Sequence, residues 1–278
     1  MTGRFERIQR GPLHLIRRDC EALQALFAAR YLTNRMICRL LYRPTTFSWC
    51  KQRLRYLFDA GYVCKRRVQV NEPDIYYLGL RGRRYIASLG EYARPEVDRI
   101  AGVSGAGAET PALMMGHDLA LSQLYVNAAL ECRQRGWSLE WENTRMIELR
   151  RLGVQPDAYL RVTGERVDKR AFIEFTAVMP TREEMRGKLN GYAALEEAMN
   201  GVTILWFTTS KGKLEQLYQQ VAEWEYADYV LLGLIEEEGE YLTQAMWKWG
   251  GSGKLVRFVT PGERILYEGG DVSRGGTA

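Results

Sequence analysis

Apolar residues in the first 61 positions recur every three or four residues, which is the spacing of an amphipathic helix. The pattern predicts helices over 18–33, 34–42 and 47–61. Thr33 or Asn34 can cap the second of these helices, because a short polar side chain accepts a hydrogen bond from the first helical turn. The early part of the chain is therefore expected to be a small helical unit.

Alternating patterns follow the third helix. Residues 62–70 and 75–80 are predicted as two short strands around the Pro-containing turn 71–74, and 81–90 as a closing helix. Three helices, a hairpin and a final helix form the order of a winged helix-turn-helix. In that design the third helix enters the major groove and the hairpin contacts the DNA backbone or minor groove.

Beyond residue 93 the chain changes character. The Gly-, Ala- and Pro-rich segment 94–112 lacks periodicity and is expected to be a linker. Elements then follow in the order α-β-β-β-α-β-α-β, which predicts a mixed sheet with helices on its faces. The expected helices cover 116–136, 181–199 and 211–226, and the expected strands 137–150, 155–162, 170–178, 201–210 and 229–236. The Gly-rich tail should hold one or two edge strands and a disordered end.

The predicted fold class is α/β, or α+β overall. We expect a winged helix domain over 1–93, the linker over 94–112, an α/β domain over 113–262 and a flexible tail over 263–278.

The net charge of +5 conceals an uneven distribution. Residues 1–95 hold 19 Lys and Arg against 7 Asp and Glu, and the rest of the chain holds 20 against 27. A basic first third on an acidic body suggests that the first third binds a polyanion, and we expect double-stranded DNA. The basic helices have no spare apolar face for lipid, so we expect no membrane partner.

The polar face of the third helix is the predicted groove-reading surface. It carries Ser48, Lys51, Gln52 and Arg55. The first hairpin strand carries the predicted phosphate contacts Lys65, Arg66 and Arg67. An Arg or Gln side chain can make two hydrogen bonds to the edge of one base, which gives sequence preference. The competing interpretation of each element is a solvated charged face on a small helical domain.

The cysteine and histidine content limits which disulfides and metal sites the chain is expected to form. The five cysteines are odd in number, have no Cys-x-x-Cys spacing, and several lie on apolar helical stripes. We therefore expect neither a disulfide nor a structural zinc site. His14 and His117 are too few for a histidine-rich metal site, including the metal site of a tyrosine relaxase. His117 is expected to cap a helix or pack as an imidazole, with a role as catalytic base the alternative.

No apolar run spans a bilayer and the N-terminus lacks a signal-peptide pattern, so a cytosolic location is expected.

Two carboxylates occupy strand positions typical of a metal-dependent nuclease. Asp157 follows Pro156 at one strand start, and Glu174 lies within the next strand. Such a pair can bind Mg²⁺ through oxygen, with the Phe175 carbonyl as a further ligand, and the metal activates a water. A nuclease would also place a lysine at position 176, on the same face as Glu174, to stabilise the charge developing on phosphorus. The chain has Thr176 there.

Other residues could complete this site. Lys188 on the following helix could reach back, and Lys169 is a weaker alternative in the turn before the strand. Glu140 or Glu142 could add a third carboxylate. The catalytic residues would then be Asp157, Glu174 and Lys188, with Asp157 and Glu174 holding Mg²⁺. We expect Lys188 to be a solvated helix charge instead, and the site to be inactive.

A family resemblance rests on both halves of the chain. The stretches that carry it are "RLRYLFDAGYV", "YYLGLRGRRYI", "HDLALSQLYV", "QPDAYLRV", "AFIEFT" and "MRGKLNGYAAL". The second half resembles the restriction-endonuclease-like fold of the PD-(D/E)xK superfamily. The two halves together resemble the replication-relaxation family of bacterial plasmids and integrative elements. That resemblance implies a DNA-binding protein in plasmid replication, mobilisation or control of the element.

Three functions stay open at this point. The first is a DNA-binding protein of a mobile element, acting in replication, mobilisation or transcriptional control, with an inactive nuclease-like domain. The second is a Mg²⁺-dependent endonuclease directed to its site by the winged helix. The third is an adaptor whose acidic second domain recruits a replication or mobilisation protein. A homodimer is compatible with each of them.

Overall fold

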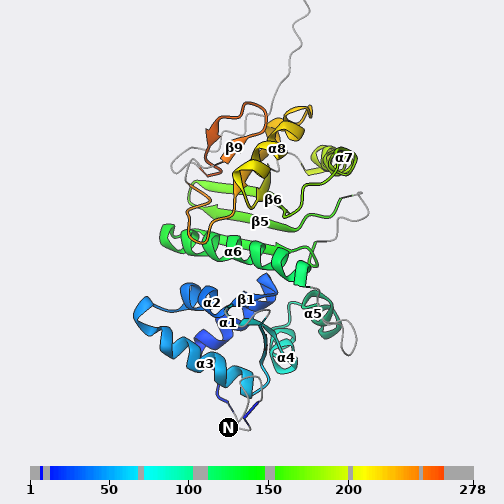
Figure 1. Ribbon diagram of the computed structural model, residues 1–278. Helices are drawn as coiled ribbons and strands as arrows, with labels where there is room; N and C mark the ends of the chain where they lie inside the picture. Colours follow the sequence, from blue (N-terminus) through cyan, green and yellow to red (C-terminus); the bar gives the residue numbers. More distant parts are fainter. Residues whose placement is uncertain are drawn as a thin grey trace, which may run out of the picture.

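The computed structural model describes residues 7–8, 13–67, 72–102, 112–147, 154–199, 203–243 and 247–259. Two units are stacked on each other, with a long helix lying between them (Figure 1). None of the helices in the described ranges has the length and apolar composition needed to span a membrane.

The first unit contains the predicted helices and hairpin. Its elements are α1 (Arg17–Ala29), β1 (Leu32–Thr33), α2 (Asn34–Leu41), the 3₁₀ turn η1 (Pro44–Thr46), α3 (Phe47–Asp59), β2 (Val63–Arg66), β3 (Ile75–Leu78) and α4 (Leu80–Ser88). The three strands form an antiparallel sheet in the order β1-β3-β2. As predicted, Thr33 caps α2, with its Oγ1 accepting from Met36 N at 3.2 Å. The tip of the predicted hairpin, 68–71, lies outside the described residues.

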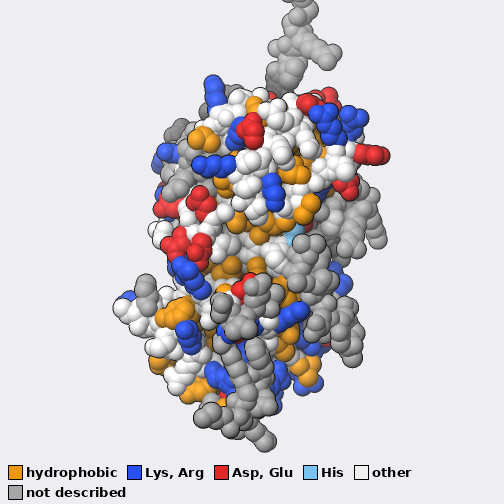
Figure 2. Space-filling model, viewed as in Figure 1, with side chains coloured by type: hydrophobic (Ala, Val, Ile, Leu, Met, Phe, Trp, Pro, Cys, Tyr) orange, Lys and Arg blue, Asp and Glu red, His pale blue; other side chains and the backbone are white. Residues whose placement is uncertain are grey.

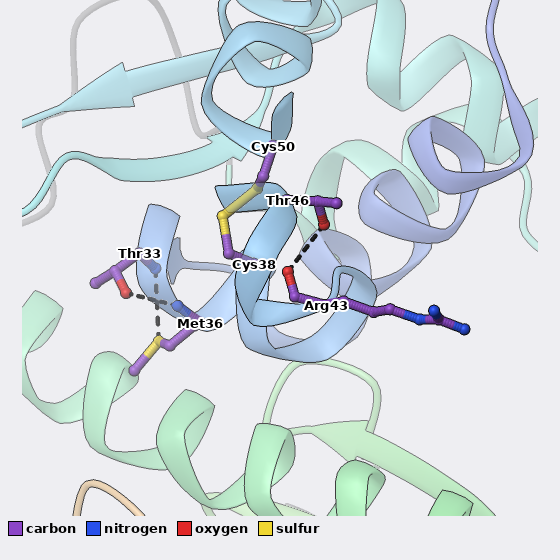
Figure 3. Close-up of a disulfide and its surroundings, with 6 residues drawn as sticks. All are labelled: Thr33, Met36, Cys38, Arg43, Thr46 and Cys50. Carbon is purple, nitrogen blue, oxygen red and sulfur yellow. Dashed lines mark hydrogen bonds between the residues drawn. A yellow bond between two sulfur atoms is a disulfide. The ribbon is translucent and has the colours of Figure 1, made fainter. Parts of the chain in front are cut away.

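A disulfide joins α2 to α3, and the prediction that the chain forms none is wrong. Cys38 and Cys50 are both buried and form the bond shown in Figure 3. Each cysteine lies on the apolar stripe of its helix, and the two stripes face each other across the first core. The packing that favours small apolar side chains therefore also brings the sulfur atoms together. Cys20, Cys64 and Cys132 are free.

The first part of the expected linker is a helix. Residues Arg94–Ile100 form α5, with Pro95 in its first turn, where the missing N–H costs nothing. Val97 and Ile100 are fully buried against the first core, and Asp98 binds Arg83 of α4 at 2.6 Å. This segment therefore belongs structurally to the first unit. Residues 103–111 lie outside the described residues.

The second unit is built on a seven-stranded mixed sheet. Its elements are α6 (Ala112–Arg135), β4 (Ser138–Asn143), β5 (Ala158–Gly164), β6 (Val167–Thr176), α7 (Arg182–Met199), β7 (Thr203–Thr208), α8 (Lys211–Ala222), η3 (Ala227–Tyr229), β8 (Val230–Leu234), β9 (Trp247–Trp249) and β10 (Leu255–Val256). The strand order is β10-β9-β8-β7-β6-β5-β4. Strands β6, β7 and β8 run parallel, and the outer pairs are antiparallel.

The predicted α/β class and order of elements are confirmed. Helix α6 covers one face of the sheet, while α7 and α8 cover the other. Of the one or two edge strands expected in the tail, β10 lies at the edge of the sheet, while β9 lies between β10 and β8. Helix α6 begins at Ala112, four residues before the predicted start, and the predicted strand 137–150 ends at Asn143 before a turn.

Helix α6 also joins the two units. Ser122 Oγ donates to the Ala29 carbonyl of α1 at 3.1 Å, and Arg133 donates to the Leu40 carbonyl of α2 at 2.6 Å. Asn143 at the end of β4 donates to the Ala28 carbonyl at 3.1 Å. These bonds satisfy carbonyls at the C-terminal ends of α1 and α2, which have no partner within their own helices. Polar contacts therefore fix the first unit on the second.

Candidate functional site

The two predicted carboxylates lie on neighbouring strands. Ala158 pairs with Ile173 in the antiparallel ladder of β5 and β6, and Asp157 N donates to the Ile173 carbonyl at 3.0 Å. In the other direction, Phe175 N donates to Asp157 Oδ2 at 2.9 Å. The register therefore places Asp157 directly beside Glu174, as the sequence pattern requires.

Glu174 is fully buried and is held by two residues of α7. Lys188 Nζ and Tyr192 Oη each donate to one of its carboxylate oxygens. These residues are four apart and so lie on one face of the helix. The prediction that Lys188 is a solvated helix charge is therefore wrong: its side chain is about one-third exposed, and its ammonium lies against Glu174.

Burial sets the protonation of this carboxyl. Removal from water and the negative charge of Asp157 raise the pKa of Glu174 to about 8, while Lys188 and Tyr192 act in the opposite direction. A buried carboxylate is costly unless it is paired and hydrogen-bonded. Lys188 and Tyr192 supply those partners.

His117 of α6 is the residue that reaches this site from the other face of the sheet. Its Nε2 lies 3.2 Å from Asp157 Oδ2, and its ring meets Phe175 edge-on with centroids 5.3 Å apart. Burial opposes the charged ring, but hydrogen bonds to Asp118 and Asp157 prevail and raise the pKa of His117 to about 10. Burial also opposes ionisation of Asp157, yet His117 holds the pKa of that carboxyl below its ordinary value.

This geometry decides between the structural interpretations of His117. It does pack as an imidazole, but it does not cap the helix, because α6 begins five residues earlier.

Thr176 fills the position where a nuclease lysine is expected. Its Oγ1 accepts a hydrogen bond from Trp206 Nε1 of β7 at 2.9 Å, and both side chains are buried. The position is therefore part of the packing between β6 and β7.

An open cavity of about 320 Å³ adjoins these residues. Its lining combines two basic side chains and one carboxylate with mostly apolar walls. The lining residues are His117, Phe175, Thr176, Ala177, Val178, Pro180, Glu184, Met185, Lys188 and Trp206. Asp157 and Glu174 are not among them, but their partners His117 and Lys188 are.

The donor set does not fit a magnesium ion in this arrangement. Both Glu174 oxygens accept from Lys188 and Tyr192, and Asp157 Oδ2 accepts from an amide and faces His117. Within the described ranges no three His, Cys, Asp or Glu side chains form a group that could hold a metal. In this arrangement His117 pairs directly with Asp157, and Lys188 with Glu174.

The other residues considered for this site lie elsewhere. Lys169 is exposed and belongs to β6 itself, so the prediction that it lies in the preceding turn is wrong. Glu140 is exposed on β4. Glu142 is half-buried on the same strand, where burial and Glu140 raise the pKa of its carboxyl.

The predicted groove-reading residues share the outer face of α3. Ser48, Lys51 and Gln52 are exposed there. Lys51 Nζ lies 4.6 Å from the Phe47 ring centroid, and Gln52 donates to Tyr56 Oη at 2.8 Å. These are contacts within the helix surface that a ligand could replace. In Figure 2 the described surface of the first unit, lower in the view, shows more blue than red side chains.

Arg55 and the hairpin cations are held more firmly. Arg55 Nε lies 3.0 Å from Oδ1 of the buried Asp59. Lys65 Nζ lies 4.8 Å from the Phe58 ring centroid, and Arg67 lies 3.3 Å from the buried Asp74. Arg66, the last residue of β2, is partly exposed.

Comparison with known families supplies the context of these two units. The family model for replication-relaxation matches residues 23–203, from α1 to the start of β7. The chain belongs to the replication-relaxation family. No curated protein and no solved structure matches it. Membership suggests a role in plasmid replication or mobilisation. The matched region of this replication-relaxation protein includes the predicted DNA-contacting residues as well as Asp157, Glu174 and Lys188.

Two members of the site in this replication-relaxation protein were not predicted as such. Tyr192 follows Lys188 by four residues, a spacing that placed both on the sheet-facing side of α7 without indicating a shared partner. His117 lies forty residues from Asp157, and only the packing of α6 on the sheet brings the two together.

Proposed function

We propose that this replication-relaxation protein is a DNA-binding protein of a mobile genetic element, with a second domain that does not cut DNA. The observation that carries the proposal is the exposed polar face of α3, Ser48, Lys51 and Gln52, in a unit whose helices and hairpin follow the winged-helix order. A winged helix presents that face to the major groove.

The internal contacts refine the role of each residue. Gln52 can contact base edges after giving up one exposed hydrogen bond, and Lys51 can reach a base or a phosphate. Arg55 is a weaker candidate for base contact, because it would have to break its ion pair with the buried carboxylate of Asp59. Lys65 and Arg66 on the hairpin supply phosphate contacts.

Binding to a random-sequence duplex pool tests this proposal. We expect the wild type to select a preferred sequence and Gln52→Ala to alter that preference. Lys65→Ala should lower the affinity for all duplexes about equally. Removing one phosphate-binding cation should reduce the salt slope, the change of log K with log salt, by about 0.9. Lys211→Ala, an exposed lysine at the start of α8, is the charge-matched control. If Gln52→Ala and Lys65→Ala both behave like this control, α3 and the hairpin do not bind DNA.

A nuclease is the second candidate, favoured by the position of Lys188 beside Glu174. The test is incubation of supercoiled and linear DNA with the protein in Mg²⁺ or Mn²⁺. We expect no cleavage, because Lys188 and Tyr192 take both oxygens of Glu174. Metal-dependent cleavage that disappears in Asp157→Ala and Glu174→Ala would establish the nuclease and refute the proposal of an inactive domain.

A further inference from the structure

Three arginines meet where the two units join. Arg30 is the residue after α1, Arg99 lies in the last turn of α5, and Arg145 lies in the turn after β4. We propose that these junction arginines form a binding site for a phosphate group other than the face of α3. Arg30 is linked to Asp157 through Asp118 and His117.

Arg30 is fixed by an ion pair and still has a hydrogen-bond donor without a partner among the described residues. It is the one residue other than glycine with positive φ in the described chain, at 67°, and it is 6% exposed. Its Nη1 pairs with Asp118 Oδ2 at 2.9 Å. Its Nε is buried and has no hydrogen-bond partner among the described residues. A buried donor without a partner is costly, and the ion-paired Asp118 Oδ2 likewise makes no hydrogen bond among the described residues.

Arg99 and Arg145 fix each other through their main chains. Arg99 Nη1 donates to the Arg145 carbonyl at 2.6 Å, and Arg145 Nη1 donates to the Arg99 carbonyl at 3.1 Å. Asn143 Oδ1 accepts from Arg145 N at 3.0 Å and so holds the turn. Both guanidinium groups are thus positioned before any ligand arrives, which reduces the entropy lost on binding.

Gly102 shows that two of these guanidinium groups converge. A Cβ atom at this position would lie 2.6 Å from Arg145 Nη1 and 3.0 Å from Arg30 Nη2. The residue also has φ +79°, which favours glycine in any case. The absence of a side chain lets the two cations approach each other beside the main chain.

Charge at the junction is not balanced by the described carboxylates. Asp118 pairs with Arg30, and Glu96 lies 3.8 Å from Arg99, but Arg145 has no ion-pair partner among the described residues. Burial, together with the charge of Arg30, lowers the pKa of Arg145. Clustered guanidinium groups match the geometry and charge of a phosphate.

The phosphate could come from the backbone of bound DNA or from free phosphate in solution. The first source rests on the proposed function, and the second does not. Two assays separate them: melting temperature in inorganic phosphate against chloride at equal ionic strength, and duplex affinity as a function of salt. The variants are Arg145→Gln and, in case that protein fails to fold, Arg99→Gln. Arg166→Gln, an exposed arginine of the β5–β6 turn, is the control.

We expect phosphate to raise the melting temperature of the wild type and Arg166→Gln, but not of Arg145→Gln. If the site serves DNA, Arg145→Gln also weakens duplex binding several-fold and reduces the salt slope by about 0.9. If Arg145→Gln binds duplex DNA as the wild type does, but its melting temperature no longer responds to phosphate, the site binds free phosphate. If Arg145→Gln and Arg99→Gln match the control in both assays, the proposal is wrong. A wild type that responds to phosphate without binding DNA refutes the proposed function and leaves this site standing.

Discussion

Replacing Glu174 by glutamine should make the protein less sensitive to pH. In the folded protein the pKa of Glu174 is raised from 4.5 to about 8, first by burial and then by Asp157. The folded state therefore binds a proton more tightly than the unfolded chain does. Stability from this group is fully present below the unfolded pKa and is lost as pH rises toward the folded pKa.

The size of the effect follows from the shift. One pKa unit corresponds to about 1.4 kcal/mol, so this group contributes on the order of 5 kcal/mol well below pH 4.5. The wild type should lose roughly 3–4 kcal/mol of that between about pH 5 and pH 8. Glutamine has the same shape, can still accept from Tyr192 and does not ionise. The Lys188 side chain is about one-third exposed, so its ammonium can turn to water in the variant.

Urea unfolding at pH 5, 6, 7 and 8 measures the effect. The free energies of unfolding of wild type and Glu174→Gln should differ little at pH 5, and the variant should become the more stable by several kcal/mol at pH 8. Glu140→Gln, an exposed carboxylate on β4, serves as control and should follow the wild type. A gap that is constant with pH would refute the reasoning. A variant that loses stability relative to wild type as pH rises would show that the Lys188 ion pair outweighs burial.

Three further changes test other parts of the molecule. Asp118→Asn should cost roughly 3–5 kcal/mol in urea unfolding, because it leaves the buried charge of Arg30 unpaired, and a cost below about 1 kcal/mol would contradict this. Reducing the Cys38–Cys50 disulfide, which links residues 12 apart, should cost about 3 kcal/mol. Thiol titration in denaturant should rise from three thiols to five on reduction, and an unchanged count would contradict the bond. Gly61→Ala should lower the free energy of unfolding by about 1–2 kcal/mol, since φ is +80° there, and calorimetry can check it.

Much of the fold could be predicted because local patterns and tertiary packing agree. The helical stripes of the first unit face one core, and the alternating strands of the second unit lie in one sheet. Helix α5 was not predicted, because seven residues are too few to show the helical repeat of apolar positions. Its contacts with α4 and the first core stabilise it. The start of α6 was misplaced because the Gly- and Ala-rich composition before it favoured a linker up to Ala112, although Thr110 and Pro111 are residues typical of a helix start.

The candidate site could be predicted only as far as strand order determines it. Asp157 and Glu174 lie on consecutive strands, so alternation and register were enough to bring them together. The cations that neutralise them come from two helices on opposite faces of the sheet. Neither the distance from His117 to Asp157 nor the pairing of Arg30 with Asp118 leaves a periodic signal in the sequence, because each depends on how separate segments pack.

The position of Thr176 bears on why the site should be inactive. A lysine there would lie on the same face of β6 as Glu174 and close to Trp206, whose Nε1 is satisfied by the threonine hydroxyl. Lys188 supplies the missing cation from α7, but its ammonium binds the carboxylate itself instead of standing beside a metal. In a nuclease the lysine stabilises charge that develops on the phosphate, so it must be available to the substrate. A lysine whose ammonium already binds Glu174 stabilises the ground state of the protein, and metal or phosphate would first have to break that contact.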